Sequence, residues 1–314
     1  MSGKVPFASI MQQDMEQLAQ DFPYAGELTG QTVLVTGATG LIGSQVVWAL
    51  AHMNRLGRAD VKILAFVRSR EKAEKVFGPL LEEGHLSLLV GDINAPIAVD
   101  GPVDYVIHGA SATSSQYFVS HPVETIYTAL DGTRHVLELA RDKKVKGFVY
   151  LSSLEVYGTP AADAGLIDES YSGYLDPMQV RSSYSEGKRM VECLCASFTA
   201  EYGVPVKVAR LSQTFGPGVQ YDDGRVFAEF ARCAIEKRNI VLHTAGRTVR
   251  SYCYTKDAVD ALLTILLRGE TGQAYNVTNM DTAMSISEMA DLVCHAFPQA
   301  GIQVEFDMPK DLAS

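Results

Sequence analysis

Residues 32–50 read TVLVTGATGLIGSQVVWAL, and this stretch decides the fold. It begins with a short apolar run, TVLVTGA, which is typical of a strand that is covered on both faces of a sheet. The segment LIGSQVVWALAHMNRLG, residues 41–57, follows with helical periodicity and ends at a glycine. Between them Gly37, Gly40 and Gly43 form a GxxGxxG pattern. Glycines let the backbone turn tightly and approach a pyrophosphate, whose charge is favoured by a helix N-terminus. The stretch therefore predicts a strand, a dinucleotide-binding loop and a helix.

The same order of strand and helix repeats along most of the chain. Apolar runs predict further strands at residues 61–67, 86–93, 103–111, 147–153 and 204–212. Helical patterns occupy intervals between them, at residues 70–84, 123–144 and 182–203. Such alternation predicts an α/β protein with a Rossmann-like, doubly wound parallel sheet, whose ligands bind at the carboxyl ends of the strands.

The alternation loosens after about Thr214, and this change suggests a division into domains. We expect a helical leader over residues 1–30 and a dinucleotide-binding Rossmann domain over residues 31–213. Residues 214–314 then form a smaller C-terminal substrate-binding lobe, partly interleaved with the core, which closes over the cleft.

Composition excludes several classes of function. The 314 residues are 47% hydrophobic and 20% charged, with a mean hydropathy of +0.04, as in ordinary globular proteins. A net charge of −10 and a pI near 5.2 argue against nucleic acid or an anionic membrane as a partner. Five scattered cysteines without a CxxC pair indicate reduced thiols, and the histidines lack metal-ligand spacing. Because there is neither a signal peptide nor an apolar run of membrane-spanning length, we expect a cytoplasmic protein without a metal site.

The glycine-rich loop is the predicted cofactor site. Its binding residues are expected to be Gly37, Thr39, Gly40, Leu41, Ile42 and Gly43. After the second strand, where NAD enzymes usually place Asp or Glu, the chain has Arg68. A guanidinium is able to pair with a 2′-phosphate, so NAD and NADP both stay open.

The ends of the third and fourth strands add further expected cofactor contacts. Asp92 is placed to hydrogen-bond the adenine amine, with Ile93 beside it. In the segment HGAS, the small residues Ala110 and Ser111 would line the cofactor, whereas His108 is expected to be a packed structural residue.

A YxxxK pair carries the predicted chemistry. Tyr184 and Lys188 are four residues apart, so both side chains project from one face of a helix. A tyrosine is a poor base at neutral pH, but a nearby ammonium and a cationic nicotinamide favour the phenolate. A hydroxyl from Ser153, at the end of the fifth strand, would complete a proton relay. Glu155 follows that strand and is either solvated or faces the ligand cleft, because a buried carboxylate needs a partner.

Several of these motifs together carry a resemblance to a known family. The segments TGATGLIG, GDI, HGAS, SSLEVYG and YSEGK occur here in the order found in extended short-chain dehydrogenases/reductases, and they resemble the NAD-dependent epimerase/dehydratase family. The resemblance covers the chain from about residue 31 to its end. It implies Ser153, Tyr184 and Lys188 as a catalytic triad, and a nucleoside-diphosphate sugar as the substrate.

The resemblance also implies a homodimer that pairs the helices near residues 122–142 and 184–202. One departure is Ala129, because the family usually has at this position an Asn that helps to hold the active-site strand.

Within the family, the chain resembles the UDP-glucuronate decarboxylase (UDP-xylose synthase) group most. The segments HGASATSSQYFVSHPVETI, DDGRVFAEF and RTVRSYCYTKDAVDAL carry this likeness. It implies that Arg225 and Arg250 meet the nucleotide diphosphate, and that Glu155 and Arg181 lie near the sugar. Guanidinium groups suit phosphate and carboxylate oxygens. The substrate-binding set is Tyr117, Arg181, Gln213, Arg225 and Arg250, and Glu155 is added to the catalytic residues.

Three positions separate the chain from related groups. Dehydratases of the family combine a Glu at the position of Glu155 with an adjacent Asp that protonates the leaving hydroxyl. Leu154 cannot donate a proton, so 4,6-dehydration is disfavoured. Gln213 replaces an Asn and Gly218 an Arg of the decarboxylase pattern, and the second change bears on which sugar nucleotide fits.

Our hypothesis is a transient oxidation at C4 of a UDP-sugar, with UDP-glucuronate favoured. Tyr184 removes the C4 hydroxyl proton through Ser153, hydride passes to the nicotinamide, the β-keto acid loses carbon dioxide, and the hydride returns to C4. Lys188 lowers the phenol pKa and holds the cofactor ribose, so Tyr184 and Lys188 are also expected cofactor-binding residues. The alternatives are a nucleotide-sugar 4-epimerase, a 4,6-dehydratase, an NADP-dependent 4-ketoreductase and, from another class, a non-catalytic dinucleotide-binding regulator.

Overall fold

The computed structural model describes residues 7–111, 114–161 and 164–308. The chain divides into two compact units, and each is described by itself. The first unit comprises Met1–Leu211 and Thr255–Val277, and the second comprises Ser212–Tyr254 and Thr278–Ser314. Residues 255–277 thus return to the first unit from the C-terminal third of the chain.

A seven-stranded sheet forms the centre of the first unit. Its strands are β1 (Thr32–Thr36), β2 (Lys62–Val67), β3 (Leu86–Val90), β4 (Tyr105–His108), β5 (Gly147–Ser153), β6 (Val206–Leu211) and β10 (Ala274–Val277). Their order is β10-β6-β5-β4-β1-β2-β3, and every neighbouring pair is parallel. The order reverses between β1 and β4, which is where ligands bind in this architecture. The predicted doubly wound parallel sheet is confirmed.

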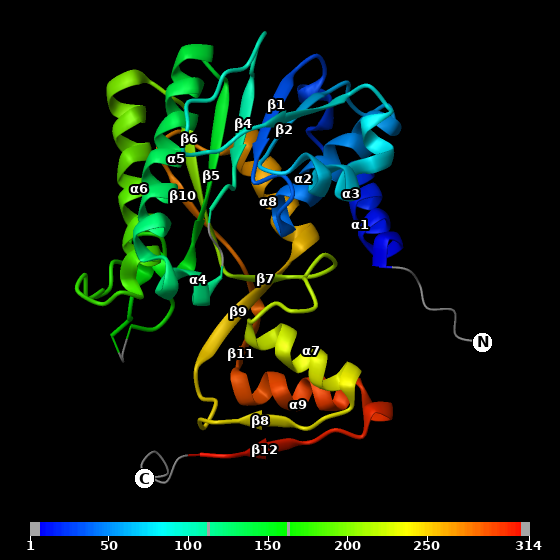
Figure 1. Ribbon diagram of the computed structural model, residues 1–314, viewed down its shortest axis with the longest axis vertical. Helices are drawn as coiled ribbons and strands as arrows, with labels where there is room; N and C mark the ends of the chain where they lie inside the picture. Colours follow the sequence, from blue (N-terminus) through cyan, green and yellow to red (C-terminus); the bar gives the residue numbers. More distant parts are fainter. Residues whose placement is uncertain (1–6, 112–113, 162–163, 309–314) are drawn as a thin grey trace. The chain divides into compact units, whose positions relative to one another are not determined.

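Helices cover both faces of this sheet (Figure 1). Helices α5 (Pro122–Lys143) and α6 (Ser182–Tyr202) pack together on one face. Helices α2 (Leu41–Arg55), α3 (Arg70–Leu81) and α8 (Thr255–Arg268) lie on the other, where α1 (Phe7–Asp21) packs against α2 and α8. The unit also has the short helix α4 (Ser115–Ser120) and the 3-10 turns η1 (Ala25–Leu28) and η2 (Leu154–Tyr157). Within the described residues, no helix combines the length and the apolar character that a membrane crossing requires.

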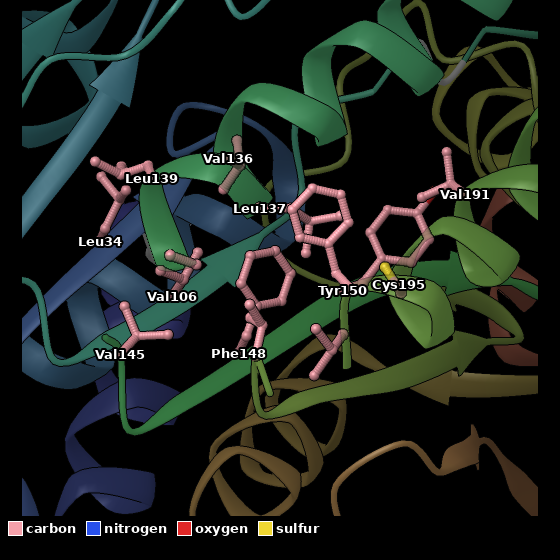
Figure 2. Close-up of a cluster of buried hydrophobic side chains, with 14 of the residues drawn as sticks. Leu34, Val106, Val136, Leu137, Leu139, Val145, Phe148, Tyr150, Val191 and Cys195 are labelled. Carbon is pink, nitrogen blue, oxygen red and sulfur yellow. The ribbon is translucent and has the colours of Figure 1, made fainter. Parts of the chain in front are cut away.

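One core cluster of the first unit lies between the sheet and the α5–α6 layer. Leu34, Val106 and Phe148 from the strands are completely buried, and they belong to one cluster with Val136 and Leu137 of α5 (Figure 2). Burial of one such side chain contributes about 1.5–3 kcal/mol. This packing makes the strand ends a rigid base for the residues that follow them.

The seventh strand, β10, was not predicted. It contains only AYNV, of which one residue is an asparagine, and so it lacks the apolar run that revealed the other six. It pairs with the edge of β6, from Ala274 opposite Val208 to Val277 opposite Leu211.

The second unit is built from short strands and two helices. Strand β9 (Val249–Tyr254) pairs antiparallel with β11 (Asn279–Ser285) and parallel with β7 (Gln213–Phe215). Strand β8 (Ile240–Leu242) pairs in parallel with β12 (Val304–Phe306). Helices α7 (Val226–Glu236) and α9 (Ile286–Ala296) pack together, and the turn η3 (Pro298–Ala300) follows α9. The core of this unit gathers aromatic and aliphatic side chains, among them Phe227, Phe230, Ile240, Tyr252 and Met289.

Candidate active site

The glycine-rich loop between β1 and α2 has the geometry of a phosphate cradle. Gly37 has a φ of +66°, and a Cβ at this position would lie 2.7 Å from the carbonyl carbon of Gly109. A Cβ on Gly43 would lie 2.4 Å from the carbonyl oxygen of Gly37. The amide of Gly40 donates to this same oxygen at 2.9 Å. The turn is therefore open to glycine alone at positions 37 and 43.

The start of α2 is suited to bind an anion. Gly40 is its N-cap residue, no side chain caps the helix, and its first turn contains no acidic residue. Amides of a helix N-terminus without a capping side chain favour a pyrophosphate. Thr39, Leu41 and Ile42 are half-buried around this turn. The cradle and the open helix end together fit a dinucleotide.

The other expected cofactor residues lie at neighbouring strand ends. Arg68 is exposed directly after β2, and Asp92 is exposed two residues after β3, where it accepts a hydrogen bond from the amide of Asn94 at 3.0 Å. Ile93 is buried against Gly132 of α5. Next to the cradle, Ala110 donates its amide to Thr36 Oγ1 at 3.2 Å, and Ser111 follows it half-buried.

His108 is a structural residue, as expected. Its ring is completely buried, with Nδ1 2.6 Å from the hydroxyl of Thr36 and Nε2 3.0 Å from that of Thr133. Burial, with a smaller effect from the Lys188 charge, lowers the pKa of His108 to about 3. The imidazole therefore stays neutral and is unsuited to acid–base work at neutral pH.

Helix α6 brings together the two residues of the YxxxK pair. Lys188 is 3% exposed, and its Nζ donates to the carbonyl of Leu151 in β5 at 2.7 Å. The ammonium lies 5.8 Å from the ring centroid of Tyr184 and 4.7 Å from that of Tyr150. One hydrogen bond and two aromatic faces thus hold the charge close to the phenol.

Desolvation tunes Lys188. Burial lowers the pKa of Lys188 to about 8, and the negative charge of Glu192, one helical turn further along α6, opposes this shift. Glu192 is itself held by Arg210 of β6, with Nη2 donating to its Oε2 at 2.7 Å, and by Ser152, whose hydroxyl donates to Oε1 at 2.5 Å. This pair is nearly buried, with side-chain exposures of 14% and 13%.

The rim after β5 contains Ser153 and Glu155. Ser153 ends the strand, and its Oγ accepts a hydrogen bond from the amide of Glu155 at 3.2 Å. The half-buried Glu155 carboxylate accepts from Arg181 Nη2 at 2.9 Å and from Ser185 Oγ at 2.8 Å. Glu155 is therefore partnered rather than simply solvated, and Arg181, expected near the sugar, is its ion partner. Leu154, beside it, contributes no polar side-chain atom.

Phe118 and Ser185 are site residues that the sequence did not predict. Phe118 of α4 is 2% exposed and stacks on the Tyr184 ring, with centroids 4.2 Å apart and planes 12° apart. The Arg181 guanidinium lies 5.0 Å from the centroid of Phe118. Ser185, which holds Glu155, directly follows Tyr184. Phe118 lies next to Tyr117 in a segment that we had singled out, but no periodicity indicated that it would meet α6.

The remaining candidates divide between the two units. Tyr117 stacks on His121 with centroids 4.6 Å apart, and Ala112 and Thr113 of the same segment lie outside the described residues. In the second unit, Gln213 begins β7, and Arg225 pairs with Asp223 at 2.6 Å. Arg250 is exposed on β9 and donates to the carbonyl of Val249 at 2.9 Å. Among the described residues, no group of three or more His, Cys, Asp or Glu side chains is placed to hold a metal ion.

Comparisons with known proteins show the family of this chain. The family model described as the NAD dependent epimerase/dehydratase family matches residues 33–280. UDP-glucuronic acid decarboxylase 3 of Arabidopsis thaliana is 34% identical over 281 residues, which is 89% of this chain and 78% of that protein. UDP-glucuronic acid decarboxylase 1 of Xenopus tropicalis is 28% identical over 267 residues, covering 83% of this chain and 60% of that protein.

Solved structures with low sequence identity share the fold. An epimerase from Methanothermobacter thermautotrophicus matches 98% of this chain and 86% of its own with a TM-score of 0.74 at 22% identity. The dTDP-glucose 4,6-dehydratase DesIV from Streptomyces venezuelae, with NAD bound, matches 88% of this chain and 85% of its own with a TM-score of 0.73 at 21% identity. The family model and the plant relative show that NAD is the cofactor and that the chain belongs to the NAD dependent epimerase/dehydratase family.

Proposed function

We propose that this enzyme decarboxylates UDP-glucuronate by a transient oxidation at C4 of the sugar. The observation that carries the proposal is the buried Lys188 ammonium beside Tyr184, in a chain that is 34% identical to a UDP-glucuronic acid decarboxylase. The substrate assignment rests on that relative, and the acid–base assignment rests on the two side chains.

The chain's own residues handle the protons. Tyr184 takes the proton of the C4 hydroxyl, with Ser153 as the relay, and gives it back when the C4 hydroxyl is restored. Lys188 supports the phenolate by its charge, since an adjacent cation favours the ionised form. When bound, NAD would supply the acceptor and then the donor of the C4 hydride, so the net change is the loss of carbon dioxide.

The oxidised sugar needs no dedicated base. With a ketone at C4, the C5 carboxylate is a β-keto acid, and its C–C bond electrons move into the ketone as carbon dioxide leaves. A proton from water then adds to C5 in place of the carbon dioxide that has left. Arg181 and Glu155, which are paired with each other, orient the sugar and its carboxylate. Leu154, beside Glu155, has no acid group to protonate a leaving hydroxyl, and this disfavours dehydration.

Arg225 and Arg250 bind the diphosphate, because a guanidinium fork fits phosphate oxygens. Tyr117 and Gln213 complete the substrate-binding set.

A homodimer and a cytoplasmic location complete the proposal. The outer faces of α5 and α6 form an apolar groove of about 320 Å³, lined by Leu130, Asp131, Arg134, Met190, Cys193, Leu194 and Ser197. Met190 is 54% exposed there, and Tyr127 of α5 is 59% exposed. A second copy that packs the same two helices would cover them. Sedimentation should give a dimer that Met190→Lys converts to a monomer; a monomeric wild type would contradict the dimer.

The cytoplasmic location is supported by the five free cysteines, which suit a reducing compartment.

Carbon dioxide release from UDP-glucuronate tests the reaction. The purified enzyme with NAD should release it and form a UDP-pentose without net NADH accumulation. Release of no carbon dioxide, with C4 hydride exchange on a UDP-hexose, would replace decarboxylation by epimerisation and leave the acid–base assignment intact. UDP-glucose is a suitable control substrate, because it has no carboxylate to lose.

A further inference from the structure

A loop in the second unit delivers Arg225, and Asp223 and the carbonyl of Thr214 hold its guanidinium. The loop joins β7 to α7, and Arg225 is the N-cap residue of that helix. Asp223 Oδ1 accepts the Arg225 amide at 2.9 Å and its Nε at 3.0 Å, while Oδ2 accepts Nη2 at 2.6 Å. The Arg225 side chain is still 38% exposed, so part of its fork is open to a ligand. A shift of Asp223 therefore frees two of the three guanidinium nitrogens, while Nη1 donates to the carbonyl of Thr214 at 3.3 Å.

Arg232 of α7 holds this loop by its backbone. Its Nη1 donates to the carbonyl of Tyr221 at 2.6 Å and to that of Asp223 at 2.7 Å. Its Nη2 pairs with Glu229, one turn earlier on the helix, and the Arg232 side chain is only 15% exposed. Nη1 thus binds two carbonyls of the loop, and the ion pair that Nη2 makes with Glu229 fixes the guanidinium against α7.

A second arginine, Arg238, shares the partner but not the loop carbonyls. Arg238 pairs with Glu229 at 2.7 Å and with Glu236 at 2.6 Å. Hydrogen bonds from Arg238 and Arg232 lower the pKa of Glu229, so this carboxylate stays charged at neutral pH. Within the described residues, Arg238 donates to no backbone carbonyl of the loop. It has the same charge as Arg232 and pairs with the same Glu229, and it therefore serves as a control for the loss of that ion pair.

We propose that Arg232 is a positioning residue that holds Asp223, and through it Arg225, in the geometry that binds the nucleotide diphosphate. The inference rests on the proposed function, which gives Arg225 that ligand. Without Arg232 the loop must be ordered when the ligand binds, and this ordering opposes binding. Arg232 itself bonds the loop and Glu229, so it acts through Arg225 and not by touching substrate.

The test compares four variants in binding and in turnover. UDP affinity is measured by calorimetry, and KM and kcat are measured with UDP-glucuronate. Arg232→Met, which keeps the length of the stem, should raise the UDP Kd and the KM roughly tenfold with kcat within about twofold. Arg232→Lys should recover most of the affinity, because one ammonium is able to donate to both carbonyls. Arg238→Met should stay within about twofold of wild type, and Arg225→Met should weaken UDP at least as much as Arg232→Met.

Each departure from this pattern has a distinct meaning. Arg232→Met with wild-type UDP affinity, or an equal loss in Arg238→Met, would overturn the positioning role while Arg225 keeps its ligand. A loss of kcat at unchanged Kd would overturn it too. Wild-type affinity in Arg225→Met would remove the diphosphate assignment itself. Thermal melting checks folding, and Arg232→Gln, which is able to reach only one carbonyl, replaces Arg232→Met if that variant does not fold.

Discussion

Lys188 in the first unit and Arg225 in the second are both cations assigned to the reaction, but the protein holds them in opposite ways. Lys188 is 3% exposed and, among the described residues, has no ion partner within salt-bridge distance. Arg225 is 38% exposed and bound through two nitrogens to Asp223. Burying a cation without an ion partner costs free energy that the rest of the fold must offset. An exposed ion pair changes the stability little, and it mainly fixes the direction of the side chain.

The difference follows from where each residue lies. Lys188 projects from a long helix onto the carbonyl of Leu151 in a central strand, so its surroundings are fixed by the core. Arg225 ends a loop, and local hydrogen bonds must replace the core. Although burial opposes it, hydrogen bonds from Arg225 keep the pKa of Asp223 below its usual range. The first unit therefore tunes reactivity by desolvation, and the second holds a binding group by charge pairing.

The largest expected effect comes from removing the buried cation. Lys188→Met should lower kcat by about 10³-fold, since proton transfer at the tyrosine loses its supporting charge. Tyr184→Phe should do the same while keeping the ring stacked on Phe118. Carbon dioxide release measures both, with thermal melting as the control for folding. More than a tenth of wild-type activity in either variant would contradict the assigned chemistry.

The next largest effect should come from breaking the nearly buried ion pair between Glu192 and Arg210. Glu192→Gln leaves Arg210 unpaired in a site where its side chain is 14% exposed, and should lower the free energy of unfolding by about 3 kcal/mol. Asp223→Asn, which breaks the more exposed pair of the second unit, should lower it by less than about 1 kcal/mol. Denaturant unfolding measures both. Equal losses in the two variants would remove the contrast between the units.

A double variant separates charge from packing. Glu192→Leu combined with Arg210→Met removes both charges, and it should regain most of the stability that Glu192→Gln loses.

Glu192→Gln should also change the pH dependence of activity. Glu192 opposes the lowering of the Lys188 pKa, so its removal should lower that pKa further, and activity should fall on the alkaline side at a lower pH than in wild type. Tyr150, His108, Cys195 and Tyr184 are the other titratable groups around Lys188, and they are unchanged in these variants.

The stability of the fold should depend on pH through Lys188. Its pKa is lowered from 10.5 to about 8, so between these values the unfolded chain binds more protons. Stability contributed by this group therefore rises with pH over that window. Below this window, Lys188→Met should be about 2 kcal/mol more stable than wild type, because it removes the buried charge but also loses the hydrogen bond to Leu151. The difference in stability between the two proteins should shrink towards the upper end of the window. Unfolding by urea at both ends measures it; a gap independent of pH would contradict the buried charge.

Local signals explain which parts of the site could be predicted from the sequence. Gly37 and Gly43 were found because the tight turn requires glycine, and the YxxxK pair because one helical turn brings both residues to one face. Both are short-range rules. The strands of the sheet were predicted for the same reason, except for β10, whose four residues carry too little apolar pattern.

Contacts between distant segments had no such signal. Phe118 meets Tyr184 from 66 residues away, and Glu192 meets Arg210 across a helix and a strand. Composition shows that charges are abundant but not which ones pair. Glu155 illustrates the limit: the sequence marked it as unusual, yet its partners Arg181 and Ser185 became visible only when η2 and the start of α6 were placed together.

The smallest expected effect is also the sharpest test of the contrast, because salt acts on exposed charges and hardly on buried ones. Raising the salt from about 0.05 M to about 0.5 M shortens the screening length several-fold, and should weaken UDP binding about three- to tenfold. Arg250→Gln, which removes one exposed cation, should reduce this dependence. The pH at which activity falls on the alkaline side should stay constant over the same salt range, because Lys188 is screened by protein rather than by ions. A shift of that pH with salt would mean that Lys188 is accessible to ions, as Arg225 is. Desolvation would then not explain the difference between the two cations.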